Sequence, residues 1–238
     1  MTRIDVLAFG AHPDDVEIHC GGFLLKMKRF GYRIGVVDLT KGELGTRGSV
    51  EIRRTESELA SKILGLDIRE NLGMPDGYLD ICEAHKRPIV RMIRKYRPTI
   101  VLTHYIEDRH TDHTKAGQLV SEAAFLSGVQ KYEPSEFSPH RPQRVIYYRS
   151  HYPSFAPSFV TDISDEFKRK MEVIKAFRSQ FDPDYSADLT YISSPRFMSN
   201  LIAETRYWGA RIGTKYGEPF FVREISRIDD PIKTWKII

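Results

Sequence analysis

Cysteine is scarce in this chain, which excludes a fold held together by disulfide bonds. Among 238 residues only Cys20 and Cys82 are present. Small secreted domains that depend on disulfides are far richer in cysteine, whereas a chain of this length can bury a core without cross-links. One bridge is arithmetically possible, but we expect two reduced thiols.

Long apolar runs and a targeting segment are also missing. No stretch of the sequence approaches the roughly 20 apolar residues that a membrane-spanning helix needs. Residues 1–5 lead almost at once into a strand pattern, and they lack the basic and apolar regions of a signal peptide. We therefore expect a cytoplasmic protein without a membrane partner.

A strong excess of charge of either sign is likewise absent. The formal net charge is +4 at pH 7, from 36 Lys and Arg residues and 32 Asp and Glu residues. The basic residues are scattered along the chain, so the composition gives no support for nucleic-acid binding. Hydrophobic residues make up 41% of the chain, as expected for a soluble globular protein with one sizeable core.

The first half of the chain alternates apolar, β-rich runs with amphipathic helical periods. Buried strands are predicted over residues 4–11, 33–39, 68–72 and 99–104. Helices are predicted over residues 16–30, 50–64, 88–96 and 115–126, with Pro88 at a first helical position. This alternation predicts an α/β fold, a Rossmann-like domain with a mainly parallel sheet and helices on both faces.

The second half of the chain is less regular. We expect strands over residues 145–149 and 159–163, a helix over 165–181 capped by Ser164, and a last helix over 195–212. No repeat or linker divides the chain, so a single domain is expected over residues 1–238. Residues 1–130 are expected to form the Rossmann-like core, which carries the polar motifs described below, and residues 131–238 a C-terminal α+β extension that completes the cleft beside those motifs.

Two polar motifs follow predicted strands. His12-Pro13-Asp14-Asp15 follows the first strand, and Asp108-Arg109-His110-Thr111-Asp112-His113 follows the strand that ends at His104. Ligands of open parallel sheets bind beyond the carboxyl ends of the strands. The two motifs are therefore expected to converge in space.

The residue types in these motifs suit a catalytic zinc site. His12, Asp15 and His113 offer two imidazoles and one carboxylate, and such a set leaves a fourth position for water. Zinc lowers the pKa of that water to about 7. Asp14, beside Asp15, is the expected general base. The same ligands accept Fe²⁺, Co²⁺ or Mn²⁺ in place of Zn²⁺.

His110 and Asp112 are predicted to act on the carbonyl oxygen and the leaving amine of the substrate. Attack on an amide builds negative charge on its carbonyl oxygen, which a protonated His110 can stabilise before it assists protonation of the leaving amine. Asp112 is expected to orient His110 and to raise its pKa, because a neighbouring anion favours imidazolium.

Each motif alone has a simpler interpretation. An aspartate at a strand-to-helix junction can be a helix N-cap, and two histidines three residues apart can be ordinary surface residues. Their joint occurrence after two buried strands favours the metal site. The first loop has no GxGxxG pattern, so dinucleotide binding has little support. A non-catalytic metal-binding protein is the alternative from a different class.

At these residues the sequence resembles the LmbE-like or PIG-L-like zinc deacetylases, which share the (A)HPDD motif and a later HxxH motif. Within that family it is most similar to the deacetylases of bacillithiol synthesis. The resemblance is carried, in order, by residues 10–15, 40–48, 53–56, 71–77 and 108–113.

The resemblance implies one zinc ion on His12, Asp15 and His113, Asp14 as general base, and His110 paired with Asp112 at the oxyanion. It implies hydrolysis of the N-acetyl group of a small-molecule GlcNAc conjugate, in particular N-acetylglucosaminyl-malate, to give glucosaminyl-malate and acetate. It also implies a homo-oligomer, for which a hexamer is the precedent. Another N-acetylated sugar, such as a chitin oligomer or a secondary-metabolite glycoside, stays open as the substrate.

Loop arginines fit the acidic aglycone of that substrate. Malate carries two carboxylates, and arginine suits their bidentate recognition. We expect Arg47, Arg53 and Arg109 at the substrate, together with Glu43 from the same resembling stretch as Arg47. A diacid-binding arginine cluster would favour malate, whereas an open aromatic groove would favour oligosaccharides.

Two positions are left open by the sequence. For Arg53 the alternative is an exposed helix residue paired with Glu51 or Glu56. Some relatives use a C-terminal tyrosine at the oxyanion, and neither Tyr185 nor Tyr191 can be assigned that role from the sequence.

Overall fold

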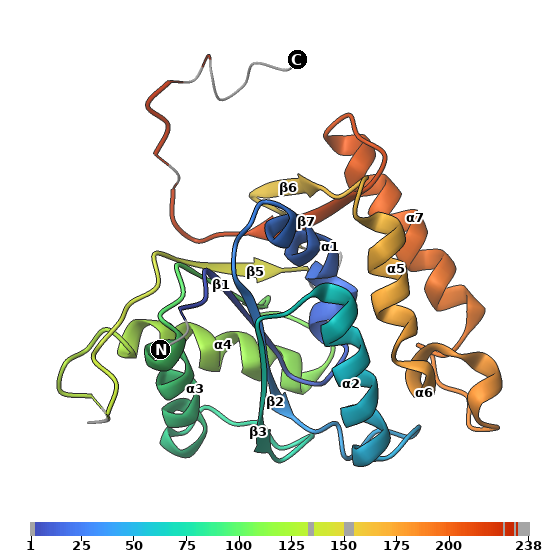
Figure 1. The fold of residues 1–238 in the computed structure, drawn as a ribbon, viewed down its shortest axis with the longest axis horizontal. Coiled ribbons are helices and arrows are strands. Elements are labelled where there is room, and N and C mark those ends of the chain that lie inside the picture. The colour runs from blue at the N-terminus through green and yellow to red at the C-terminus, as the bar shows by residue number, and fades with distance from the viewer. Residues whose placement is uncertain (1–2, 133–135, 150–154, 226, 231, 233–238) are drawn as a thin grey trace.

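A seven-stranded sheet organises the computed structural model, in the order β3-β2-β1-β4-β5-β7-β6 (Figure 1). The structure describes residues 3–132, 136–149, 155–225, 227–230 and 232. Its strands are β1 (Val6–Gly10), β2 (Ile34–Thr40), β3 (Ile68–Met74), β4 (Ile100–His104), β5 (Arg144–Tyr148), β6 (Phe159–Asp162) and β7 (Gly217–Phe221). Its helices are α1 (Asp15–Arg29), α2 (Val50–Leu64), α3 (Glu83–Tyr96), α4 (Thr111–Leu126), α5 (Phe167–Lys175), α6 (Arg178–Phe181) and α7 (Pro195–Arg211), with a 3₁₀ turn over Pro183–Tyr185.

The five strands β1 to β5 are parallel, as the alternation of strands and helices predicts. Successive strand residues point to opposite faces: Val6 and Ala8 join one apolar core, and Leu7 and Phe9 join the other. Helices α1, α2, α5 and α7 cover the first face, and α3 and α4 cover the second (Figure 1). The expected α/β fold with helices on both faces is confirmed.

The C-terminal part closes the sheet with an antiparallel strand that the sequence did not reveal. Strand β7 runs antiparallel to both β5 and β6. Its Glu218 is buried, accepts hydrogen bonds from the backbone N–H groups of Gly22 (2.9 Å) and Phe23 (2.6 Å), and pairs with Lys170 at 2.7 Å. Helix α1 is kinked at Cys20, so Glu218 caps the amides that the kink exposes.

Three predicted helices differ from the observed ones. Helix α3 begins at Glu83, because the polar turn before Pro88 is also helical, and Pro88 therefore lies inside the helix. Helix α4 begins at Thr111, so His113 lies in its first turn.

The predicted helix over residues 165–181 is two helices, α5 and α6. The chain turns at Phe177, because the buried carboxylate of Glu56 accepts a hydrogen bond from the backbone N–H of Ser179 (2.6 Å) at the start of α6. Ser164 does not cap α5, since its hydroxyl donates to Asp162 at 2.6 Å. Within the part of the chain described, no helix has both the length and the apolar character needed to cross a bilayer.

Candidate metal centre and active site

The loop between β1 and α1 holds the first motif at the carboxyl edge of the sheet. Asp14 precedes the first residue of α1 with a φ of 113°, in the left-handed region that residues other than glycine rarely adopt. Its side chain makes no capping hydrogen bond to the helix. The N-cap interpretation of the aspartate is therefore wrong for Asp14, and the strained backbone is of the kind that concentrates at functional sites.

The three predicted metal ligands meet in one cluster, which we call the metal cluster: His12, Asp15 and His113. Their donor atoms lie within 4.8 Å of one another, and all three residues are buried. Asp15 lies between the two imidazoles, 3.3 Å from Nδ1 of His12 and 3.2 Å from Nε2 of His113. Two nitrogens and one carboxylate at this spacing fit a divalent cation such as zinc.

A second group with the same spacing shares His12 and adds His110 and Asp112. His110 is exposed in this group, whereas every member of the metal cluster is buried. The chemistry expected of His110 also requires a ring that is free of metal. The metal cluster therefore fits a divalent cation better than this second group does.

Carboxylates outside the metal cluster hold its histidines in place. Asp76 lies 3.0 Å from Nε2 of His12, and Asp108 lies 3.3 Å from Nδ1 of His113. Such outer partners fix the orientation of metal-binding imidazoles and raise their basicity. Neither role was predicted from the sequence, although Asp76 lies in one of the resembling stretches and Asp108 in the second motif.

Buried His104, the last residue of β4, is a further partner that the sequence analysis missed. Its Nε2 lies 3.1 Å from Asp15. Burial lowers the pKa of His104 to about 4, so this ring is neutral at pH 7. Burial would raise the pKa of Asp15, but His113 and His104 hold it well below the usual range, which keeps the carboxylate ionised for a cation.

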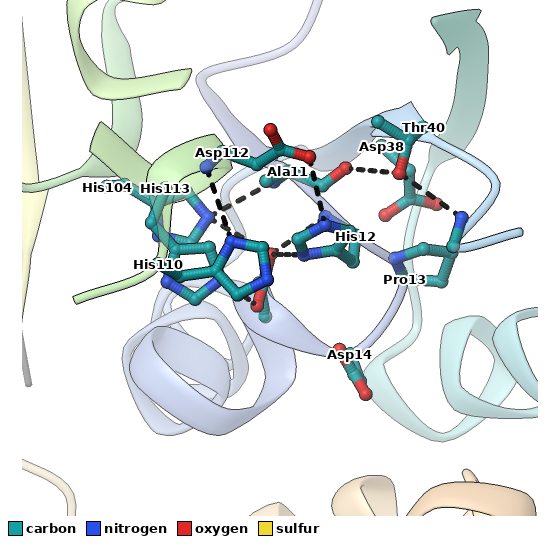
Figure 2. Close-up of polar contacts among 12 residues, drawn as sticks. Ala11, His12, Pro13, Asp14, Asp38, Thr40, His104, His110, Asp112 and His113 are labelled. Atoms are coloured by element: carbon teal, nitrogen blue, oxygen red, sulfur yellow. Dashed lines mark hydrogen bonds and ion pairs between the residues drawn. The ribbon is translucent and has the colours of Figure 1, made fainter. Parts of the chain in front are cut away.

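Asp14 stands apart from this network of carboxylates and imidazoles (Figure 2). Its carboxylate lies 3.2 Å from Nη2 of Arg53, which also donates to the carbonyl of Pro13 at 2.5 Å. Burial raises the pKa of Asp14 to about 7, although the charge of Arg53 opposes the shift. A carboxylate with a pKa near the working pH is suited to take and return a proton.

His110 and Asp112 are close to the cluster, but their relation differs from the predicted one. The backbone N–H of Asp112 donates to Nδ1 of His110 at 3.2 Å, while the carboxylate of Asp112 accepts from the backbone N–H of Gly77 at 2.7 Å. Burial and the neighbouring His113 lower the pKa of His110. The charge of Asp112 does raise this pKa, as expected, but burial and His113 outweigh it, and the carboxylate of Asp112 faces Gly77 and His12.

The four predicted substrate residues do not form one group. Arg109 lines the pocket over the metal cluster, and its guanidinium lies 5.1 Å from the ring centre of Tyr191. Arg53 also lines the pocket but is buried against Asp14, so the alternative of an exposed surface pair is wrong. Arg47 is buried away from the pocket and donates to the carbonyl of Asp182 at 2.6 Å.

Glu43 is exposed, and its carboxylate binds the backbone of two loops near the pocket. Its carboxylate accepts from the backbone N–H groups of Asp76 at 2.9 Å and Lys41 at 3.2 Å. Neither Glu43 nor Arg47 lines the pocket. Of the three arginines expected to bind a dicarboxylate, only Arg109 lines the pocket without a carboxylate partner among the described residues.

The pocket over the metal cluster has a volume of about 320 Å³. Asp14, His110, Arg53 and Arg109 line it together with the cluster, and Ile192 and Phe197 add apolar wall. The arrangement brings a cation site, a carboxylate with a pKa near 7 and an imidazole to one cavity. These are the parts required for metal-assisted hydrolysis of an amide.

Substitution of Asp76 by asparagine tests the outer partner of His12. Asp76→Asn removes the charge next to Nε2 of His12 and keeps an oxygen for the backbone N–H of Leu44, which Asp76 binds at 2.9 Å. We expect the affinity for zinc to fall by about 10- to 100-fold, measured by competition with a chelator. Asp80→Asn, on an exposed residue of the same loop, is the control. Equal zinc affinity of both variants and the wild type would contradict this role.

Comparison with known proteins agrees with this geometry. The family model for PIG-L, GlcNAc-PI de-N-acetylase, matches residues 7–124. Diacetylchitobiose deacetylase of Thermococcus kodakarensis is 34% identical over 193 residues, which are 75% of this chain and 71% of that protein. The conserved protein TT1542 from Thermus thermophilus is 37% identical, with a TM-score of 0.86 over 95% of this chain and 98% of that chain.

The 4-oxalmesaconate hydratase of Pseudomonas putida is also similar, at 26% identity over 73% of either chain. Taken together, the fold, the site and these matches define a metal-dependent hydrolase of amide bonds. The chain belongs to the PIG-L family of N-deacetylases. The resemblance, the fold class and the deacetylase activity expected from the sequence are thereby confirmed.

Proposed function

We propose that the protein hydrolyses the N-acetyl group of a GlcNAc conjugate, with one zinc ion held by His12, Asp15 and His113. The observation that carries the proposal is the convergence of these three donors with Asp14 and His110 on one pocket. The deacetylase relatives support an N-acetylated sugar as substrate. A cytoplasmic homo-oligomer stays a prediction.

The chemistry divides between the ion and the side chains. A zinc ion held by His12, Asp15 and His113 would polarise the amide carbonyl and make water acidic enough to attack at neutral pH. Asp14 takes the proton of the attacking water, and Arg53 holds its carboxylate in place. His110 faces the same pocket, where its ring donates a hydrogen bond to the developing oxyanion, and Asp14 returns the proton taken from water to the leaving amine.

Two aglycones are compatible with this site. Malate in N-acetylglucosaminyl-malate is supported by Arg109, for which no carboxylate partner is found among the described residues. Arg47 and Arg53 are engaged elsewhere and do not add to a diacid site. A neutral sugar, as in a chitin disaccharide, is supported by a second cavity that continues from the pocket past Arg109.

An acetate-release assay tests the proposed function. The zinc-loaded protein is incubated with N-acetylglucosamine, N-acetylglucosaminyl-malate and N,N'-diacetylchitobiose, and acetate and free amine are measured together. We expect equimolar acetate and amine from at least one conjugate. Hydration of 4-oxalmesaconate without acetate release from any of the three sugars would contradict the proposal.

A further inference from the structure

A second cavity continues from the metal pocket toward α7, and we call it the α7 pocket. Its volume is about 240 Å³. Ile18, His19, Arg109 and Phe197 line both cavities. Because the cavities share these walls, a ligand whose acetamido group lies at the metal cluster can extend into the α7 pocket.

The polar lining of the α7 pocket comes from separate elements of the fold. Arg149 follows the last residue of β5, and Asn200 and Glu204 lie one turn apart on α7. Arg149 and Glu204 form an ion pair whose side chains are 26% and 24% exposed. The amide of Asn200 donates to the hydroxyl of Tyr191 at 3.5 Å. Donors and acceptors therefore gather around one small cavity.

These side chains restrict the chemistry of a ligand. Arg149 only donates hydrogen bonds, an ionised Glu204 only accepts them, and Asn200 does both. A sugar hydroxyl donates and accepts, so neighbouring hydroxyls can satisfy Arg149 and Glu204 without separating the pair. A carboxylate can only accept, and Glu204 would repel it. The lining suits an uncharged polyhydroxyl unit better than a dicarboxylate.

We propose that the α7 pocket is a subsite for a second, uncharged sugar unit joined to the reacting amino sugar. Arg149, Asn200 and Glu204 bind the hydroxyls of that unit. Arg109, stacked on Tyr191 where the two cavities meet, marks the boundary between the units. The subsite rests on the proposed function, because the reacting end of the ligand must lie at the metal cluster.

Variants on α7 test the subsite by comparing two substrates. Asn200→Ala and Glu204→Gln are assayed with N-acetylglucosamine and N,N'-diacetylchitobiose. We expect each variant to lower kcat/KM for the disaccharide by about tenfold, chiefly through KM, because one hydrogen bond to the second unit is lost. For the monosaccharide, kcat/KM is expected to stay within about twofold of the wild type. This substrate has no second unit, so it makes no contact with the altered side chains.

Ser199→Ala is the matched control on the same helix. Its exposed hydroxyl bonds to the carbonyl of Pro195, and the residue does not line the α7 pocket. Equal losses on both substrates, or no loss on the disaccharide in either pocket variant, would overturn the subsite alone. Acetate release by the wild type from N-acetylglucosaminyl-malate alone would overturn the subsite and leave the proposed function standing, whereas release from none of the three sugars would contradict both. Asn200→Ala keeps the Arg149–Glu204 ion pair, so it tests the subsite even if Glu204→Gln folds poorly.

Discussion

Asp14→Asn is expected to lower kcat for acetate release by about a thousandfold, within the range that general base catalysis contributes. Asparagine has the shape of aspartate but cannot take a proton. Its amide oxygen can still accept from Arg53, which lies 3.2 Å from the carboxylate, so the loop should keep its conformation. The measurement is kcat at saturating substrate on protein of known zinc content.

The zinc content of Asp14→Asn is expected to equal that of the wild type, because Asp14 is not in the metal cluster. Asp165→Asn is a suitable control, since that side chain is 79% exposed. A fully active Asp14→Asn protein would show that another group takes the proton. Loss of zinc together with activity would make Asp14 part of the metal site instead.

His113→Ala is expected to abolish acetate release through loss of the metal. His113 contributes one of the two imidazoles of the metal cluster, and its removal also leaves the buried carboxylate of Asp15 with one fewer partner. We expect the affinity for zinc to fall by more than about 100-fold, beyond what loss of an outer partner costs. The measurements are zinc competition with a chelator and acetate release at equal protein concentration.

His85→Ala provides the matched control for a lost imidazole. His85 lies on α3, and its contacts are with Asp80 rather than with the metal pocket. Its zinc affinity and acetate release are expected to match the wild type. Full activity of His113→Ala in a zinc-free buffer would contradict the assigned ligand set.

The parallel core was predictable because its signals are local. Apolar β-rich runs mark β1 and β4, and a polar motif follows each of them. Parallel strands place both motifs at the same edge, which is why His12, Asp15 and His113 could be grouped from the sequence. Strand β7 gave no comparable signal, because three of its five residues are glycine, glutamate and proline, which are uncommon in strands.

The surroundings of the site depend on contacts that no local pattern encodes. Arg47 and Arg53 are close in sequence but have different partners. Arg47 donates a hydrogen bond to the carbonyl of Asp182, which follows α6, whereas Arg53 forms an ion pair with Asp14. Asp76 reaches His12 only because the loop after β3 folds back over the first motif. The pKa of His110 likewise depends on burial and on neighbouring imidazoles.

Reconstitution of the metal-stripped protein with zinc tests most directly whether hydrolysis depends on a metal ion at His12, Asp15 and His113. Acetate release from N,N'-diacetylchitobiose or N-acetylglucosaminyl-malate is followed as zinc is added in known amounts. The assigned zinc site predicts no activity without metal and a rise that ends at one zinc ion per chain, with no such rise in His113→Ala. Acetate release at the full rate by the metal-free protein would contradict it.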